Sequence, residues 1–133
     1  MGTNPANIQI IQSAGGLISC ISNAAYYQRV TLSWTILGST TTVVFSGSGE
    51  DVPMKTSNGA TSVSLPAARQ NFNISALFEF STAGPNGPFQ QAAVKDPVVT
   101  QSGSMTLIQV VSEDSTDQDF NDSYLTISYF SLG

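Results

Sequence analysis

Hydrophobic and polar residues alternate with a period of two in one segment of the chain after another. The alternation is clearest over residues 28–37 (QRVTLSWTIL), where apolar and hydroxyl side chains take turns. This period is typical of a β-strand with one face in the core, because successive side chains of a strand point to opposite sides. The apolar face of this predicted strand carries Val30, Leu32, Trp34 and Ile36. Trp34 is in phase with the others, so we expect it to pack in the core.

Other segments rich in Val, Ile, Thr and aromatic residues are separated by Gly, Pro and Asn about every ten residues. No window of helical length shows apolar residues at i, i+3 and i+4. The pattern therefore predicts one all-β domain over residues 1–133, an antiparallel β-sandwich of about nine strands with Greek-key connections. The further predicted strands cover residues 7–12, 16–22, 40–46, 62–66, 72–81, 91–95, 104–111 and 124–130.

The composition supports a folded domain and excludes several classes of function. The chain is 41% hydrophobic and only 10% charged, which is not the composition of a disordered protein. Its net charge is −5, and the four basic residues are spread along the sequence. We therefore expect no binding to nucleic acid and no simple attraction to anionic lipid. No apolar run is long enough to insert into a membrane.

The chain has no His and a single Cys. Catalysis by Ser-His-Asp or Cys-His groups is therefore excluded, and soft ligands for zinc are too few. Cys20 lies in the apolar alternation ISCISN, so we interpret it as a small buried hydrophobic residue. The first residues, MGTNPANIQIIQSAGG, show no basic region followed by a long apolar one, which predicts no signal peptide and synthesis in the cytoplasm.

Residues 112–123 (SEDSTDQDFNDS) hold five of the nine acidic residues of the chain. Predicted strands on both sides keep these carboxylates close together, and their repulsion costs stability unless a positive charge compensates it. Because the four basic residues are all distant in sequence, we infer that a bound cation does so. An unliganded, solvated acidic turn is the alternative.

The ligand types favour Ca²⁺, because carboxylate and amide oxygens without His or Cys form a hard, all-oxygen site. Residues 117–121 (DQDFN) have the D-x-D-x-N alternation that opens an EF-hand loop, but the rest of that motif is absent. Four or five carboxylates exceed what one divalent ion needs. We therefore predict two Ca²⁺ ions per subunit that share bridging carboxylates.

The acidic segment, followed by a final strand and a C-terminal Leu-Gly, resembles the fucose-binding lectin II family of bacterial calcium-dependent lectins. A second similar segment is ISNAAYYQRVTLSW at residues 21–34. The resemblance implies a nine-stranded sandwich in which hydroxyl groups of fucose or mannose coordinate two adjacent calcium ions. Similar lectins that lack a leader sequence often act outside the cell, so we expect an extracellular or cell-surface function.

The resemblance also assigns roles to individual residues. Glu113 and Asp117 would bind the first ion, and Asp119 and Asp122 would bridge both ions. Asn121 would bind the second ion through its side chain.

Residues of the predicted loop near position 24 complete the implied site. Asn23 would give its backbone carbonyl to the second ion, and Asp114 would accept a hydrogen bond from the sugar. The loop Ala24-Ala25-Tyr26 would face the sugar, and Ala at its first position favours mannose. Tyr26 departs from the family, which usually has only small residues there.

Gly133 would carry its terminal carboxylate to a calcium ion of a partner subunit, which implies a homodimer and allows a tetramer. The tail from Asp122 to Gly133 is one residue longer than the family pattern. A bulge in the tail would preserve this contact across the dimer.

Two other classes of function fit parts of the sequence. A glycosidase would use paired carboxylates, but the acidic residues cluster in one segment with no obvious partner on another strand, so we expect no enzymatic activity. A calcium-stabilised adhesion or membrane-binding module would need basic or apolar loop tips, which the sequence does not clearly show.

Overall fold

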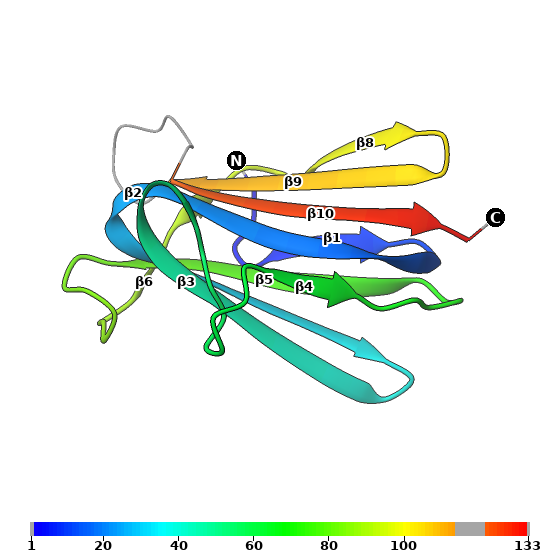
Figure 1. Ribbon diagram of the computed structural model, residues 1–133, viewed down its shortest axis with the longest axis horizontal. Coiled ribbons are helices and arrows are strands. Elements are labelled where there is room, and N and C mark those ends of the chain that lie inside the picture. Colours follow the sequence, from blue (N-terminus) through cyan, green and yellow to red (C-terminus); the bar gives the residue numbers. More distant parts are fainter. Residues whose placement is uncertain (1, 114–121, 133) are drawn as a thin grey trace.

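A computed structural model describes residues 2–113 and 122–132. These residues form ten strands with antiparallel pairing and contain no helix, so no helix among them could span a membrane (Figure 1). The predicted all-β fold is confirmed. The strands are β1 (Ala6–Ile10), β2 (Ser13–Ile36), β3 (Ser39–Pro53), β4 (Ser62–Leu65), β5 (Phe72–Ser81), β6 (Gln90–Gln91), β7 (Ala93–Val94), β8 (Val98–Ser102), β9 (Met105–Glu113) and β10 (Ser123–Ser131).

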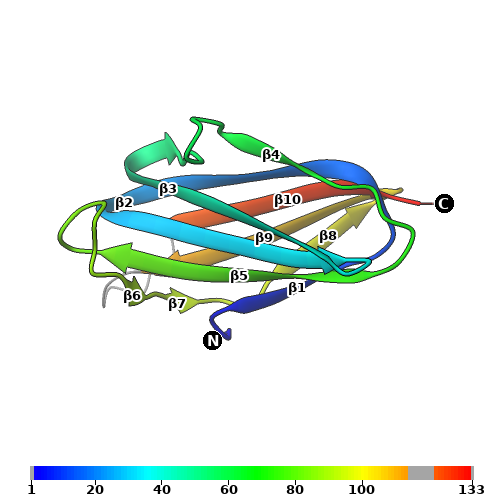
Figure 2. The same cartoon turned by 90° about the horizontal axis from the view of Figure 1, so that it is seen from below.

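Strand β2 belongs to both layers of the sandwich. Its first half pairs with β10 on one side and β4 on the other, and the order continues from β10 to β9. Its second half pairs with β5 and β3, and β1 lies on the far side of β5. The two layers are thus one continuous sheet folded over at β2. Figure 2 shows β3 and β4 diverging on one side of β2.

The predicted strands 16–22 and 28–37 are one strand, and the predicted loop Ala24-Ala25-Tyr26 lies inside it as an irregularity. In the pairing with β3, Ala24 lies opposite Gly49 and Gln28 lies opposite Gly47. Residues 25–27 of β2 therefore face the single residue 48 of β3. Such a bulge bends a strand and increases its twist, and here it marks the place where β2 passes from one layer to the other.

The core follows the alternation read from the sequence. Val30 and Leu32 are fully buried, Trp34 is 5% exposed, and Ile36 at the strand end is only partly buried. Cys20 is buried as expected, and burial raises the pKa of its thiol. One cluster of buried side chains includes residues of both layers. Each large side chain in it contributes about 1.5–3 kcal/mol through burial.

Three strand predictions need correction. The strand predicted at 40–46 continues to Pro53, because the Gly-rich stretch after Phe45 stays extended beside the bulge of β2. The strand predicted at 91–95 is two short pieces, β6 and β7, which pair with different strands. Strand β8 was not predicted. All its residues are exposed, so its sequence carries no core-facing alternation.

Candidate functional site

Three segments that carry predicted site residues meet at one end of the sandwich. These segments are the end of β9, the start of β10 and the bulge of β2, on the left in Figure 1. The Asn23 N–H donates to the Asp122 carbonyl (2.8 Å), and the Asp122 N–H donates to the Ser112 carbonyl (3.0 Å). The backbone of Asp122 therefore lies between Asn23 and the residue that precedes Glu113.

Glu113 and Asp122 are both nearly buried, with exposures of 1% and 7%. A carboxylate removed from water is stable only with compensating charge or hydrogen bonds. The other predicted site residues, namely Asp114, Asp117, Asp119, Asn121 and Gly133, lie outside the described residues. Within residues 2–113 and 122–132, no group of three metal-ligating side chains is present.

The bulge of β2 presents only part of the predicted sugar-facing segment to solvent. Ala24 is 7% exposed and packs inward, whereas Ala25 and Tyr26 are exposed. The buried side chain of Gln28 holds this bulge from the interior of the sandwich. Its Nε2 donates to the Tyr26 carbonyl (3.2 Å), and its Oε1 accepts from the Ser123 hydroxyl (3.0 Å). The bulge and the start of β10 are thus joined by two connections, one through Asn23 and one through Gln28.

A row of buried serines lies under this end of the sandwich, and sequence reasoning missed it. Ser123 of β10 pairs with Ser22 of β2 on one side and with Ser112 of β9 on the other. All three are at most 1% exposed. The Ser123 hydroxyl donates to Gln28, but the hydroxyls of Ser22 and Ser112 have no hydrogen-bond partner among residues 2–113 and 122–132. Because unpaired buried hydroxyls are uncommon in folded proteins, this row indicates a place where polar groups serve something other than core packing.

The described residues fit a hard cation in their chemistry. Two buried carboxylates lie beside the row of buried hydroxyls, and the chain contains no His. Oxygen ligands of this kind are those that Ca²⁺ takes in proteins.

One basic residue is closer to these carboxylates than its sequence position suggested. The Lys95 N–H donates to the Val111 carbonyl (3.1 Å), two residues before Glu113. The backbone of Lys95 therefore lies beside the end of β9.

A second cluster supports the bulge from the outer side of the other layer. The Arg29 guanidinium donates from Nε and Nη2 to Glu79 Oε1 (3.0 and 2.8 Å). It also lies 3.6 Å from the centre of the Phe89 ring. Tyr27 contacts the same ring, and its hydroxyl donates to Ser46 (2.9 Å). These contacts hold the backbone that follows Tyr26.

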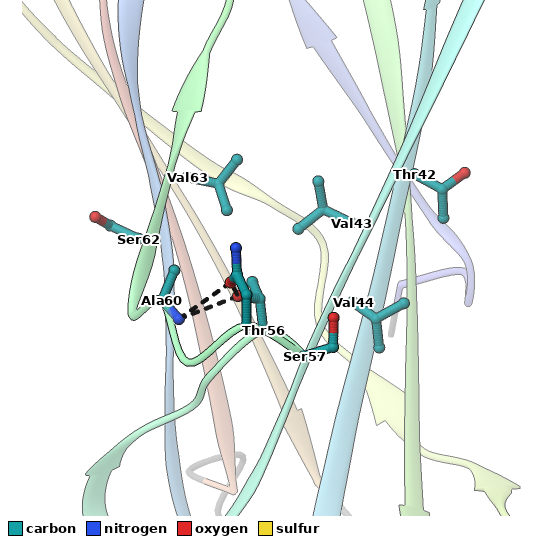
Figure 3. A pocket seen from close by; sticks show the side chains of 9 residues that line it. Thr42, Val43, Val44, Thr56, Ser57, Ala60, Ser62 and Val63 are labelled. Carbon is teal, nitrogen blue, oxygen red and sulfur yellow. Dashed lines mark hydrogen bonds between the residues drawn. The ribbon is translucent and has the colours of Figure 1, made fainter.

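A separate pocket of about 540 Å³ lies where β3 and β4 diverge (Figure 3). Val43 and Val63 point toward each other across it, and the segment between β3 and β4 forms its floor with hydrogen bonds from the Ala60 N–H. Its lining residues are Thr42, Val43, Val44, Thr56, Ser57, Asn58, Ala60, Ser62 and Val63. None of these is charged or aromatic, so this pocket is not the site that the acidic segment predicts.

The C-terminal end of β10 lies at the opposite end of the sandwich from Glu113 and Asp122 (Figure 1). The Leu132 N–H donates to the Gln12 carbonyl (2.7 Å), which holds the end of the described chain there. Strand β10 keeps a regular register with β9 from Ser123 to Phe130. The irregular pairing with β2 near Tyr129 places the additional residue in β2, so no bulge in β10 is visible up to Ser131.

Comparison with known proteins gives the family. The sequence model of Fucose-binding lectin II (PA-IIL) matches residues 8–131. The chain belongs to the fucose-binding lectin II family. No curated protein matches significantly.

Several solved lectin structures share the fold of this family member at low sequence identity. A high-affinity mannose-binding lectin of Ralstonia solanacearum is 19% identical with a TM-score of 0.63, over 98% of this chain and 100% of that one. A Chromobacterium violaceum lectin in complex with alpha-methyl-fucoside is 19% identical with a TM-score of 0.65, over 98% and 100%. The C-terminal domain of a Burkholderia cenocepacia lectin is 16% identical with a TM-score of 0.59, and both chains are fully covered.

Proposed function

We propose that this family member is a non-catalytic lectin that binds mannose and fucose through two Ca²⁺ ions, with mannose favoured. The observation that carries the proposal is the hydrogen bond between Asn23 and Asp122. These two predicted ligands come from opposite ends of the sequence, and this bond places them side by side. The family match over residues 8–131 supports the same function.

The predicted chemistry explains why a sugar needs such a site. A neutral, hydrated monosaccharide gains little from ordinary hydrogen bonds, because it exchanges them for bonds to water. Calcium, when bound, supplies open coordination positions to vicinal hydroxyls and selects for their relative orientation. In the described part of the chain, Glu113 and Asp122 would provide carboxylates, and Asn23 would provide its backbone carbonyl. The remaining proposed ligands are Asp117, Asp119, Asn121 and a partner's C-terminus.

We further propose that two copies form a dimer through the outer face of the layer that contains β10. Leu17, Val98 and Phe130 are each more than half exposed on this face. Apart from Glu113, which is buried at the end of β9, the outward residues of β2, β10, β9 and β8 in this layer include no charged side chain. Exposed apolar surface of this kind is typical of an interface between proteins.

The geometry of the chain also favours a dimer. The end of β10 lies away from Glu113 and Asp122 of the same chain. A two-fold axis across the face would place the C-terminal segment of each copy near the acidic end of the other. Phe130 is exposed and its neighbour Tyr129 is buried in the core, so Phe130 is the residue of β10 to change. Phe130→Ser should shift the protein toward the monomer in sedimentation velocity.

Calorimetric titration tests the binding function. Methyl α-mannoside and methyl α-fucoside should bind in calcium, and both should lose binding when calcium is chelated. The matched control is Asp96→Asn, which changes an exposed carboxylate that is not a proposed ligand, whereas Asp122→Asn should abolish binding. Sugar binding that survives chelation would refute the proposed mechanism. Aryl glycosides should bind without being hydrolysed, and measurable turnover would favour a glycosidase instead.

Thermal unfolding tests the metal independently of the sugar. Calcium should raise the melting temperature, because it binds the folded state and relieves repulsion between carboxylates. Calcium present at about a hundred times its dissociation constant would add about 2.7 kcal/mol to the free energy of unfolding. An unchanged melting curve on addition of a chelator would contradict the calcium assignment.

A further inference from the structure

The ring of Tyr26 lies on the exposed side of the β2 bulge, three residues after Asn23. It is 41% exposed, yet it is not a loose surface side chain. Its ring lies nearly parallel to that of Phe80, with centroids 6.0 Å apart and an angle of 20° between the planes. Phe80 is itself buried in the core. One side of the Tyr26 ring therefore packs against the sandwich, and the remaining surface of the ring faces solvent.

The backbone of Tyr26 is fixed relative to the acidic end of the molecule. Gln28 Nε2 donates to the Tyr26 carbonyl, and Gln28 Oε1 accepts from Ser123, which directly follows Asp122. Asn23, at the other end of the bulge, is bonded to Asp122 itself. Three extended residues span at most about 10 Å, so the Tyr26 backbone lies within the length of a disaccharide of Asn23.

Tyr27 provides the contrast that shows what is special about Tyr26. The Tyr27 hydroxyl donates to Ser46, and its ring contacts Phe89. Both the ring and the hydroxyl of Tyr27 therefore contact other residues of the fold. In the described part of the chain, no hydrogen bond holds the hydroxyl of Tyr26. A rigid aromatic ring with a free face and a free hydroxyl, held next to a predicted sugar site, has the properties of a binding platform.

We propose that Tyr26 forms a second subsite, which stacks against the sugar ring that follows the coordinated monosaccharide in a glycan. This inference rests on the proposed function, and it adds a preference for ligands longer than one sugar. The CH groups on one side of a pyranose form an apolar surface that fits an aromatic ring, and the Tyr26 hydroxyl is placed to bond the polar edge. The cation site binds the first sugar, and Tyr26 distinguishes what is attached to it.

The test compares two ligands that share the first sugar. Methyl α-mannoside lacks a ring at the second position, whereas phenyl α-mannoside carries one. We expect the wild type to bind the phenyl glycoside about two- to tenfold more tightly, the range expected for one aromatic contact. Tyr26→Ala should reduce this ratio to about one, whatever its effect on the affinity for methyl α-mannoside, because the two ligands share the first sugar. Tyr26→Phe should keep most of the preference, and Tyr27→Phe should leave it unchanged.

A second measurement does not depend on any variant. In saturation-transfer NMR on the wild type, the phenyl protons and the second ring of methyl mannobiosides should receive saturation, as the first ring does.

A ratio of phenyl to methyl glycoside affinity that is the same in the wild type and in Tyr26→Ala would overturn the subsite. So would a second ring that receives no saturation in any mannobioside. Absence of binding by both methyl glycosides would instead overturn the proposed function, and the subsite with it.

Discussion

Two rows of inward-facing side chains in the same layer occupy equivalent positions on the same three strands, yet they differ completely in chemistry. One row is Ile18, Ile127 and Ile108, and the other, four residues along each strand, is Ser22, Ser123 and Ser112. All six side chains are at most 1% exposed. The difference is therefore not one of burial but of position, because the serine row lies beside Asn23, Glu113 and Asp122.

The two rows contribute differently to stability and to function. The isoleucine row removes large apolar surfaces from water, which is the main favourable term in folding. The serine row removes hydroxyl groups from water, and two of them have no partner in the described part of the chain, which costs about 1–3 kcal/mol for each such group. The small polar side chains at this end lower the free energy of unfolding, and they provide a polar surface under the proposed binding site.

The largest effect should follow from a change in the isoleucine row. Ile127→Ala leaves a cavity in the fully buried centre of the layer, and we expect a loss of about 2–5 kcal/mol in the free energy of unfolding. Urea denaturation in a chelator measures this loss without a contribution from the metal. The control is Thr126→Ala on the outer side of the same strand, where we expect a small effect. Comparable losses for the two variants would show that the row is not the centre of stability.

A smaller effect should follow from a change in the support of the serine row. Gln28→Leu removes the partner of the Ser123 hydroxyl, and we expect a loss of about 1–3 kcal/mol in the free energy of unfolding, because a buried hydroxyl is left unpaired. The tie between the bulge and β10 is lost with it, so affinity for methyl α-mannoside should fall as well.

The double variant separates these two consequences of the Gln28 change. Ser123→Ala in the Gln28→Leu background should recover much of the stability, since both partners are then absent. It should not recover sugar affinity, because the Tyr26 carbonyl still lacks its donor. Recovery of both would show that Gln28 acts only by satisfying Ser123.

The same contrast shows what the sequence can reveal about this fold. Alternation within a strand identified Val30, Leu32 and Trp34 as core residues, because that information is local. Alternation could not show that β2 continues through residues 23–27, since the bulge depends on pairing with Gly47 and Gly49 of a distant strand. Strand β8 had no apolar face to detect. Its pairing with β9 is set by the hairpin, not by burial.

Only part of the candidate site was predicted from the sequence. Resemblance to the lectin family predicts that Asn23 lies with the acidic segment, and of that segment the structure shows Asp122 bonded to Asn23 through the backbone. The serine row was missed because a lone Ser in a strand is usually taken as an outward residue. A signal was nevertheless present. Ser22 is in phase with Ile18 and Cys20, and Ser112 is in phase with Ile108 and Val110, so the period of two already placed both hydroxyls inside.

The smallest effect, and the most specific one, should come from the unpaired hydroxyls themselves. Ser22→Ala removes a buried hydroxyl that has no partner among the described residues, so in a chelator we expect the free energy of unfolding to rise by about 1 kcal/mol rather than fall. The control is Ser19→Ala, on the opposite face of the same strand, where a partly exposed hydroxyl should make little difference. A clear loss of stability in Ser22→Ala would show that this hydroxyl is satisfied in solution, and the serine row would then be a stabilising element like the isoleucine row.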